Sequence, residues 1–275
     1  MTSVAAVIVT KDAERWLPAL LSSIEGQARP VDEVVAVDDG SMDGTRGLLH
    51  AAGVRVLDAA TVSTDVTTRI AQNFVQGVRA CRGADLVALG DHDDVWHPDR
   101  VAHQAGILEV WAEALMLASD GQVVDAAGQT SGGTLRDAFP LPVGWDDLTP
   151  SGRMRAVLRT SVATGGASMI RPAAFPSLDV PEGWLHDRWW SLVATGRNGL
   201  IVDRHDVIDY RVQPGQRLGL DPGAQRHAPL GRLSALVGQG TRAAGKARDL
   251  RTRLRPLIED PEVAAVVNLR SVLWP

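Results

Sequence analysis

The chain has 275 residues, of which 45% are hydrophobic and 22% charged, and its formal net charge is −5. That composition excludes a largely disordered chain, and the acidic balance gives no electrostatic reason to expect a nucleic-acid partner. The single cysteine, Cys81, excludes an intrachain disulfide, and the apolar runs are too short for a signal peptide or a membrane span, so we expect a cytoplasmic protein.

Apolar runs and amphipathic segments alternate along the first third of the chain. Residues 12–23 and 67–80 carry apolar side chains at the spacing of one helix face. Three apolar runs are typical of strands buried in a sheet, at residues 4–9, 34–37 and 86–89, and residues 54–57 predict a further short strand between them. The alternation predicts βαβ units with right-handed crossovers, and hence an α/β fold with a mostly parallel sheet.

The periodic pattern weakens beyond Asp120. Residues 121–129 are typical of a hairpin, and residues 131–150 are rich in Gly and Pro, which favours an exposed loop. The later elements that we expect are a strand at 164–170, a helix at 185–195 and a strand at 207–211. Gly and Pro cluster again between Pro214 and Pro222, where we expect the main domain to end.

An acidic loop follows the second predicted strand. Asp38 and Asp39 precede Gly40, a residue that permits a tight turn. Their carboxylates can accept hydrogen bonds from a nucleobase N–H or from ribose hydroxyls. The loop is equally compatible with a structural role, in which its Asp and Ser side chains cap a helix that starts near Gly44.

A second acidic loop follows the fourth predicted strand and contains Asp91, Asp93 and Asp94. Three carboxylates at the end of a buried strand repel one another, so they require a cation or hydrogen-bond donors. Residues i and i+2 of an extended loop point the same way, so we expect Asp91 and Asp93 to converge, one toward a ribose and one toward a divalent ion. Mg²⁺ and Mn²⁺ suit carboxylate and phosphate oxygens, although acidic loops also occur without any ligand.

These loops resemble motifs of the family 2 glycosyltransferases, which have the GT-A fold with a Rossmann-like nucleotide-binding half. The matching segments are Val9–Leu17, Asp38–Thr45, Thr68–Phe74, Asp91–Arg100 and His186–Trp190. The resemblance implies a glycosyltransferase domain at 1–215 and a basic, helical C-terminal extension at 216–275. Within the domain it implies a nucleotide-sugar-binding half at 1–120 and an acceptor-binding half at 121–215. The DHDDVW sequence of the second loop favours the rhamnosyltransferase-like branch, with a deoxyhexose donor.

The resemblance implies an inverting, metal-dependent enzyme that moves a sugar from a nucleotide diphosphate donor to an acceptor hydroxyl. In such a single displacement a carboxylate takes the hydroxyl proton, and Mg²⁺ or Mn²⁺ neutralises the departing diphosphate. The implied donor-binding residues are Thr10, Asp38, Asp39, Arg69 and Asp91. Asp93 matches the metal ligand of the family and Asp187 its catalytic base.

Asp187 also has a structural interpretation, because an acid at the start of a helix is stabilised by the dipole and by free N–H groups. Trp184 and Trp190 are candidates for stacking against an acceptor sugar, and His186 for orienting it. Trp189 falls on the apolar face of the predicted helix, so we expect it in the core.

The sequence departs from the family at Gln213. Many family members have a histidine near this position that completes the metal site, and an amide is a poor substitute for imidazole. We expect either water or His205 to complete the coordination, or a metal that is bound more weakly than in those relatives.

Two other functions are compatible with these residues. One is a sugar-nucleotide-binding protein without catalysis, which the departure at Gln213 favours. The other is a haloacid-dehalogenase-like phosphatase, since Leu86–Val95 fits that family's apolar strand followed by acids. Such phosphatases need a helper lysine, and neither Lys11 nor Lys246, the two lysines of the chain, is well placed.

The segment from Arg226 to Arg255 has eight Lys or Arg residues and a single acid, Asp249. Apolar residues at 230–237 precede most of these cations. The pattern is typical of a helix that lies on an anionic membrane surface or grips a phosphorylated acceptor, and also of a solvated helix packed on the catalytic domain. The acceptor classes that we expect are a glycan, a lipid-linked acceptor at the inner membrane face, or a small molecule.

Overall fold

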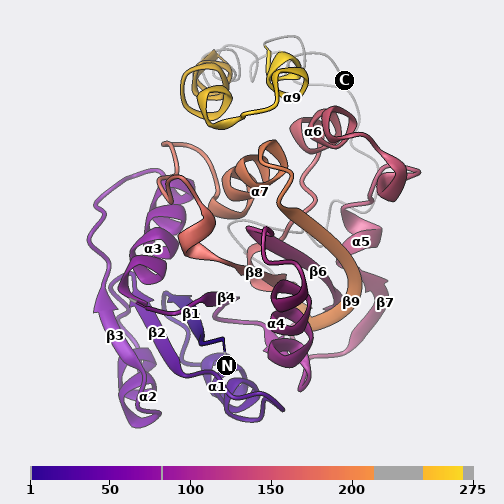
Figure 1. Cartoon of the computed structure of the whole chain (residues 1–275). Coiled ribbons are helices and arrows are strands. Elements are labelled where there is room, and N and C mark those ends of the chain that lie inside the picture. Colours follow the sequence, from indigo (N-terminus) through magenta and orange to yellow (C-terminus); the bar gives the residue numbers. More distant parts are fainter. Residues whose placement is uncertain (1, 82, 214–243, 269–275) are drawn as a thin grey trace, which may run out of the picture.

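The computed structural model describes residues 2–81, 83–213 and 244–268 (Figure 1). Within these residues a sheet of nine strands has the order β3-β2-β1-β4-β8-β6-β9-β5, and β7 pairs with β6 beside that path. Helices cover both faces of the sheet, as expected for a GT-A fold (Figure 1).

The N-terminal half is a parallel unit in which strands and helices alternate. Its strands are β1 (Val4–Thr10), β2 (Glu33–Asp38), β3 (Arg55–Asp58) and β4 (Leu86–Asp91), and they confirm the four strands predicted there. β1 lies between β2 and β4, and β3 pairs with the far side of β2. The connecting helices are α1 (Leu17–Glu25), α2 (Thr45–Ala51) and α3 (Val66–Ala80). All four strands therefore end at the same edge of the sheet.

The first helix begins later than predicted. Asp12 has a φ of +48°, in the left-handed region, so no helix can run through it. Pro18 then falls in the first turn of α1, where its missing N–H removes no helical hydrogen bond. Residues 11–16 consequently form a loop at the end of β1 rather than the start of a helix.

The second half of the sheet is mixed. β6 (Met116–Val124) pairs parallel with β9 (Leu200–Arg211) and antiparallel with both β7 (Thr130–Thr134) and β8 (Ser168–Ile170). β8 also pairs antiparallel with β4, and β5 (Val95–Trp96) pairs antiparallel with β9. The predicted hairpin is thus confirmed, while the mostly parallel arrangement holds only for the N-terminal half.

Four helices accompany this second half. They are α4 (Arg100–Val110), α5 (Leu135–Ala138), α6 (Pro150–Arg159) and α7 (His186–Gly196). α7 confirms the helix predicted at 185–195. α5 lies inside the segment 131–150 that we expected to be an exposed loop, and α6 begins at its end. Thr134 and Thr149 cap these two helices through their side-chain oxygens, a local signal that the Gly and Pro content obscures.

Two apolar layers lie on opposite faces of the sheet. On one face β1 contributes Val7, which belongs to the core with α3, α6 and α7, including the buried Trp189. On the other face β1 contributes Ile8, and α1, α2 and α4 complete the layer. This alternation follows from the two-residue period of a strand and makes the parallel strands apolar on both sides.

The described part of the C-terminal extension is helical and packs on the main domain. Residues 244–249 are helical, and three short elements follow: η5 (Leu250–Leu254), η6 (Arg255–Leu257) and α9 (Pro261–Val266). Their buried apolar residues belong to the core that contains α6 and α7. The expected boundary at 214–222 lies outside the described residues. No helix in the described ranges has the length and apolarity needed to cross a membrane.

Candidate functional site

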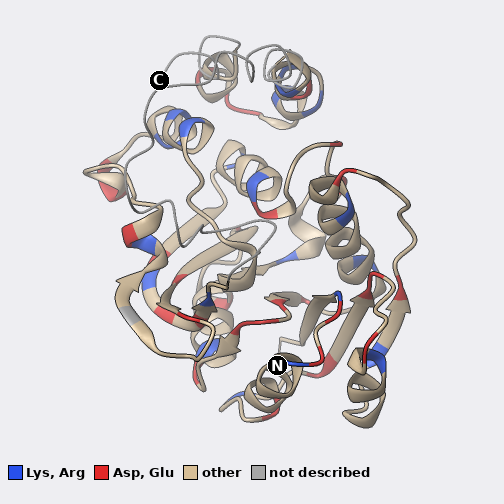
Figure 2. Ribbon diagram, turned by 180° about the vertical axis from the view of Figure 1, so that it is seen from behind, with Lys and Arg blue, Asp and Glu red and all other residues tan. Residues whose placement is uncertain are grey.

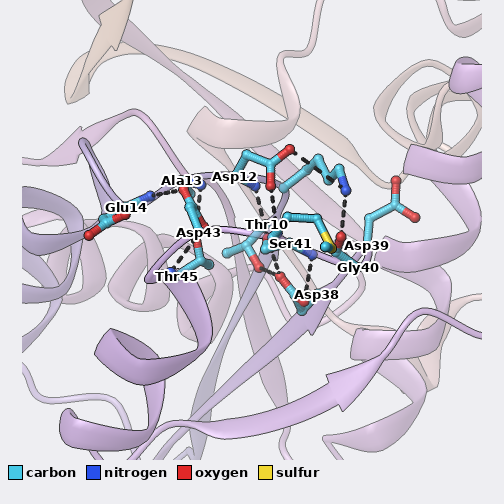
Figure 3. A network of polar contacts seen from close by, with 12 residues as sticks. Thr10, Asp12, Ala13, Glu14, Asp38, Asp39, Gly40, Ser41, Asp43 and Thr45 are labelled. Carbon is cyan, nitrogen blue, oxygen red and sulfur yellow. Dashed lines mark hydrogen bonds and ion pairs between the residues drawn. The ribbon is translucent and has the colours of Figure 1, made fainter.

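The loops after β1 and β2 meet around the buried carboxylate of Asp38 (Figure 3). Its Oδ1 accepts hydrogen bonds from the hydroxyls of Thr10, at 2.9 Å, and Ser41, at 2.6 Å. Its Oδ2 accepts from the backbone N–H of Ser41, at 3.0 Å, and from Arg46, at 3.2 Å. Burial raises the pKa of Asp38, but these donors outweigh burial and hold that pKa below its ordinary value. Thr10 and Asp38, both expected to bind the donor, therefore contact one another, and the Asp38 carboxylate is occupied by protein donors.

Further hydrogen bonds join the two loops into one unit (Figure 3). The backbone N–H of Asp12 donates to the hydroxyl of Ser41, and the N–H of Met42 donates to the Asp12 carboxylate, both at 2.8 Å. The N–H of Glu14 donates to Asp43 at 3.0 Å. These contacts explain the positive φ of Asp12, because that conformation turns both its N–H and its carboxylate toward the neighbouring loop.

Asp39 lies at the open side of the same loop. Its Oδ2 accepts a 3.1 Å hydrogen bond from Nε of Arg69 on α3, which confirms that these two predicted residues are neighbours. The side chains of Arg69 and Asp39 remain 23% and 16% exposed, unlike that of Asp38. The Asp39 backbone N–H donates to the carbonyl of Thr10 at 2.9 Å. Asp39 and Arg69 therefore present polar atoms at the edge where β1 and β2 end.

The acidic loop after β4 brings several carboxylates together with Asp187. Burial raises the pKa of Asp91 to about 7, and the negative charges of Asp93 and Asp187 add to the rise. Burial, followed by the charges of Asp93 and Asp91, holds the pKa of Asp94 well above its ordinary value. The carboxylates of the β4 loop and of Asp187 on α7 are therefore close enough for their charges to affect one another.

Two residues at the end of β9 hold this acidic loop. The backbone N–H of Arg211 donates to Oδ1 of Asp94, at 3.2 Å, and its Nε donates to the carbonyl of Asp93, at 2.9 Å. The guanidinium of Arg211 also lies 4.6 Å from the ring centre of Trp16. The Nε2 amide of Gln213 donates to Oδ2 of Asp93 at 3.0 Å. Gln213 therefore contacts the proposed metal ligand, where the family pattern has a histidine.

A buried arginine, Arg100, offsets part of the negative charge of the acidic loop. Arg100 is 0% exposed and packs over the ring of Trp96 at 3.8 Å. Burial lowers the pKa of Arg100 to about 9, while the charges of Asp94 and Asp91 raise it again. Its guanidinium donates to the carbonyls of Leu89, at 2.7 Å, and Ser168, at 3.3 Å. Arg100 lies within a predicted motif, but burial of an arginine gives no sequence signal, so its role was missed.

Asp187 lies in the first turn of α7. Its Oδ2 accepts from the backbone N–H of Gly165, at 3.0 Å, and its Oδ1 accepts from the N–H of Arg188, at 2.6 Å. Burial raises the pKa of Asp187, and these two donors only reduce the rise. A carboxylate with a raised pKa binds a proton more readily than an exposed one, which suits a general base.

The three residues expected to bind an acceptor lie in the core instead. Trp190 is 0% exposed and Trp184 5%, so neither ring offers a free face to a sugar, and that interpretation is wrong for this structure. The indole N–H of Trp190 donates to the carbonyl of Leu178, and that of Trp184 to Asp249. His186 is 3% exposed and stacks on Phe74 with ring centres 3.8 Å apart.

The donor set fits a divalent cation that takes few protein ligands. Among the described residues, Oδ2 of Asp94 is buried without a hydrogen-bond partner, and the side-chain bond that the carboxylate of Asp93 accepts comes from the neutral amide of Gln213. Carboxylate oxygens of this kind suit Mg²⁺ and Mn²⁺. No group of three or more His, Cys, Asp or Glu side chains among the described residues is arranged to hold a metal by itself. His205 pairs with Asp99 rather than with Asp93, at 2.8 Å.

Comparisons with solved structures support the fold. S. aureus TarS, in a crystal structure with UDP-GlcNAc, superposes with a TM-score of 0.65 at 16% identity, covering 99% of this chain and 72% of that one. Glucosyl-3-phosphoglycerate synthase from Mycobacterium tuberculosis has a TM-score of 0.54 at 19% identity, covering 78% of this chain and 73% of that one. That structure contains Mn²⁺, UDP and glucosyl-3-phosphoglycerate.

The sequence itself identifies the family. Comparison with curated protein sequences found no match. The model of glycosyl transferase family 2, however, matches residues 5–173, which include both acidic loops and more than half of the chain. The chain therefore belongs to glycosyl transferase family 2 and is a glycosyltransferase.

Proposed function

We propose that this glycosyltransferase uses a divalent cation and inverts the anomeric configuration as it moves a sugar from a nucleotide diphosphate to an acceptor hydroxyl. One observation carries the proposal: the acidic loop and the start of α7 meet at one pair of glycines. The N–H of Gly165 donates to Asp187, and a Cβ added to Gly166 would lie within 3.2 Å of Oδ2 of both Asp91 and Asp94. A cation with a diphosphate and a proton acceptor are the two partners that inverting transfer requires at such a place.

The donor nucleotide lies, in this proposal, along the ends of β1, β2 and β4. Asp39 and Arg69 keep exposed polar atoms there and contact the base or ribose directly. Thr10 and Asp38 act mainly by fixing the loop, because the Asp38 carboxylate already accepts four protein hydrogen bonds. The carboxylate of Asp91 accepts a hydrogen bond from a ribose hydroxyl. We favour a deoxyhexose as the donor sugar, because the sequence DHDDVW resembles that of the rhamnosyltransferase-like branch.

The cation, Mg²⁺ or Mn²⁺, is assigned to Asp93. When bound, it would neutralise the negative charge that develops on the departing diphosphate. Mn²⁺ accompanies UDP in the structure of glucosyl-3-phosphoglycerate synthase, which supports the assignment. Gln213 and Arg211 orient Asp93, and Arg100 offsets the charge of the carboxylates while the cation is absent.

Asp187 is assigned as the base. The N–H groups of Gly165 and Arg188 fix both of its oxygens, so the carboxylate has one orientation. It then takes the proton from the acceptor hydroxyl as that oxygen attacks the anomeric carbon from the face opposite the diphosphate. The diphosphate leaves in the same step, and no covalent enzyme intermediate forms.

The C-terminal extension is our candidate for contact with an anionic acceptor or with the inner face of a membrane. In its described part Ala247, Leu250 and Leu254 are buried, while Arg248 and Arg251 are exposed. Figure 2 shows Lys and Arg as blue segments of the helical C-terminal elements. Each cation near an anionic surface contributes about 1 kcal/mol. Salt-sensitive cosedimentation with anionic liposomes that is lost in Arg248→Glu/Arg251→Glu supports a peripheral membrane location; equal binding to neutral liposomes contradicts it.

Ligand-induced changes in melting temperature test the proposed function. The protein is heated with UDP, dTDP or GDP, each with and without Mn²⁺, because a ligand at about 100 times its Kd stabilises by about 2.7 kcal/mol. We expect one nucleotide to stabilise the protein only with Mn²⁺, and Asp93→Ala to remove that effect. Stabilisation without hydrolysis or transfer of a donor sugar would favour the non-catalytic binding protein. A covalent aspartyl adduct with a phosphate analogue would favour the phosphatase.

A further inference from the structure

A short turn between α6 and β8 touches both halves of the site. This turn, η2 (Gly165–Ala167), is a single 3₁₀ turn that follows Thr164. The N–H of Gly165 donates to Oδ2 of Asp187 at 3.0 Å. The next residue, Gly166, packs against the acidic loop, where an added Cβ would lie 3.2 Å from Oδ2 of Asp91 and would collide with Oδ2 of Asp94. Two successive residues of one turn therefore contact the proposed base on one side and the acidic loop on the other.

Both glycines are closely surrounded, and by different groups. A Cβ on Gly165 would lie 2.6 Å from Nε2 of His186. A Cβ on Gly166 would collide with Oδ2 of Asp94 and lie 3.2 Å from Oδ2 of Asp91. Neither residue has a positive φ within the described backbone, so the requirement for glycine here is one of space.

The side chains around the turn are held by their own contacts, so they cannot move aside for an added methyl group. The ring of His186 is stacked on that of Phe74, with ring centres 3.8 Å apart. It also packs edge-to-face with the ring of Trp190, with ring centres 5.4 Å apart. Within the ranges that the structure describes, both ring nitrogens of His186 are buried without a hydrogen-bond partner, so packing against its neighbours sets the position of the ring. Oδ1 of Asp94 accepts from the N–H of Arg211, which holds that carboxylate against the turn.

The far side of the turn is anchored to α4. The side-chain amide of Gln104 donates to the carbonyl of Ala167, at 2.9 Å, and Arg100 donates to the carbonyl of Ser168, at 3.3 Å. The Ser168 hydroxyl closes the turn by donating to the carbonyl of Thr164, at 2.7 Å. The turn is thus fixed on both sides, and its two glycines have a set spacing.

We propose that Gly165 and Gly166 are positioning residues that hold Asp187 and the acidic loop at the separation needed for transfer. The role rests on the proposed function, because it assumes that Asp187 receives the acceptor proton and that the loop carries the donor with its cation. Gly165 acts through Asp187 and affects the chemical step. Gly166 acts through Asp91 and Asp94 and affects cation and nucleotide binding. His186 sets the position of the turn by filling the space against Gly165.

Paired alanine variants separate these two effects. Gly165→Ala should lower kcat about 10²-fold, in the range for a misplaced general base, while Mn²⁺ and nucleotide binding by calorimetry stay unchanged. Gly166→Ala should weaken Mn²⁺ and nucleotide binding about 10–100-fold, as changes around metal ligands do. Gly47→Ala is the matched control, because Gly47 lies in α2 with no atom close to an added Cβ and should change neither property.

Rescue keeps the test decisive if an alanine variant folds poorly. Adding His186→Ala to Gly165→Ala removes the atom that the new Cβ would meet, so the double variant should recover a large part of the lost kcat, whereas His186→Ala alone should not raise kcat. A carboxyl ¹³C titration of Asp187 gives a readout without turnover: it should shift in Gly165→Ala and not in Gly166→Ala. Identical losses in both glycine variants, or no rescue by His186→Ala, would overturn the proposal. Absence of any transfer by the wild-type chain would overturn the proposed function. The titration of Asp187 and the binding measurements would still test whether Gly165 and Gly166 position these groups.

Discussion

The side-chain amide of Gln213 donates a 3.0 Å hydrogen bond to Oδ2 of Asp93. An amide nitrogen cannot bind a cation, so here the residue orients the proposed ligand without adding one. Gln213→His would place an imidazole beside Asp93 and should tighten Mn²⁺ binding about tenfold, which corresponds to about 1.4 kcal/mol.

Titration of Mn²⁺ in the presence of nucleotide, by calorimetry, checks this prediction. Gln213→Leu is the control, because it removes the hydrogen bond and offers no ligand in return. Equal Mn²⁺ affinities for the wild type, the histidine variant and the leucine variant would show that Gln213 does not face the cation.

Asp93→Ala should abolish transfer and the Mn²⁺-dependent part of nucleotide binding while the protein stays folded. Asp93 is held by Gln213 and by Arg211 at its carbonyl, and the second of these contacts survives the substitution. Circular dichroism and the melting temperature of the metal-free protein report on folding. Wild-type turnover of this variant without a divalent ion would refute the metal assignment.

Asp187→Asn should lower the rate about 10²–10⁴-fold with normal donor binding, because the base acts only on the attacking hydroxyl. Burial raises the pKa of Asp187, and only the carboxylate accepts a proton. The wild-type rate should therefore rise with pH through that raised pKa and reach a plateau. Single-turnover rates at several pH values measure this; a loss of donor affinity at an unchanged rate would make Asp187 a binding residue.

His186 should make the protein less stable in acid. Burial lowers the pKa of His186 from an ordinary 6.5 to about 3. Between these values the unfolded chain binds a proton that the folded one does not, so stability is full above pH 6.5 and falls as the pH drops, by at most about 1.4 kcal/mol per unit. His186→Leu removes the group and its slope. Urea unfolding of both proteins from pH 7 to 4.5 checks this, and parallel pH profiles would contradict it.

The acidic loops could be located from sequence because a buried parallel strand has a strong local pattern. The runs that end at Val37 and Leu89 are apolar throughout, and the polar residues that follow must lie at the carboxyl edge of the sheet. Asp39 and Arg69, both expected from the family motifs to bind the donor, lie on neighbouring elements of this alternating unit and contact one another. Those contacts depend on neighbouring elements, whose order the βαβ rule predicts.

Contacts formed across the second half of the sheet could not be found this way. Arg211 reaches the loop at Asp93 from a strand more than a hundred residues later, and its register with β6 shifts at two irregular points. Trp190 was a candidate for stacking against an acceptor sugar, but the segment before α7 covers it. The indole N–H donates to the carbonyl of Leu178, and the ring lies 6.2 Å, centre to centre, from that of Phe175. A helical wheel shows which side chains share a face of the helix, but it does not show how many neighbouring segments pack against that helix.

The central claim, that Asp93 and Asp187 together support a single displacement with inversion, can be measured without an acceptor. The nucleotide that stabilises the protein with Mn²⁺ identifies the nucleotide part of the donor, and its sugar derivatives are then tested as donors. Slow transfer of the sugar to water is followed by ¹H NMR of the anomeric proton. An α-linked donor should release the β-anomer first, only with Mn²⁺, with little release by Asp93→Ala or Asp187→Asn. Release of the α-anomer first, or release that is independent of Mn²⁺ and of both carboxylates, would contradict the account.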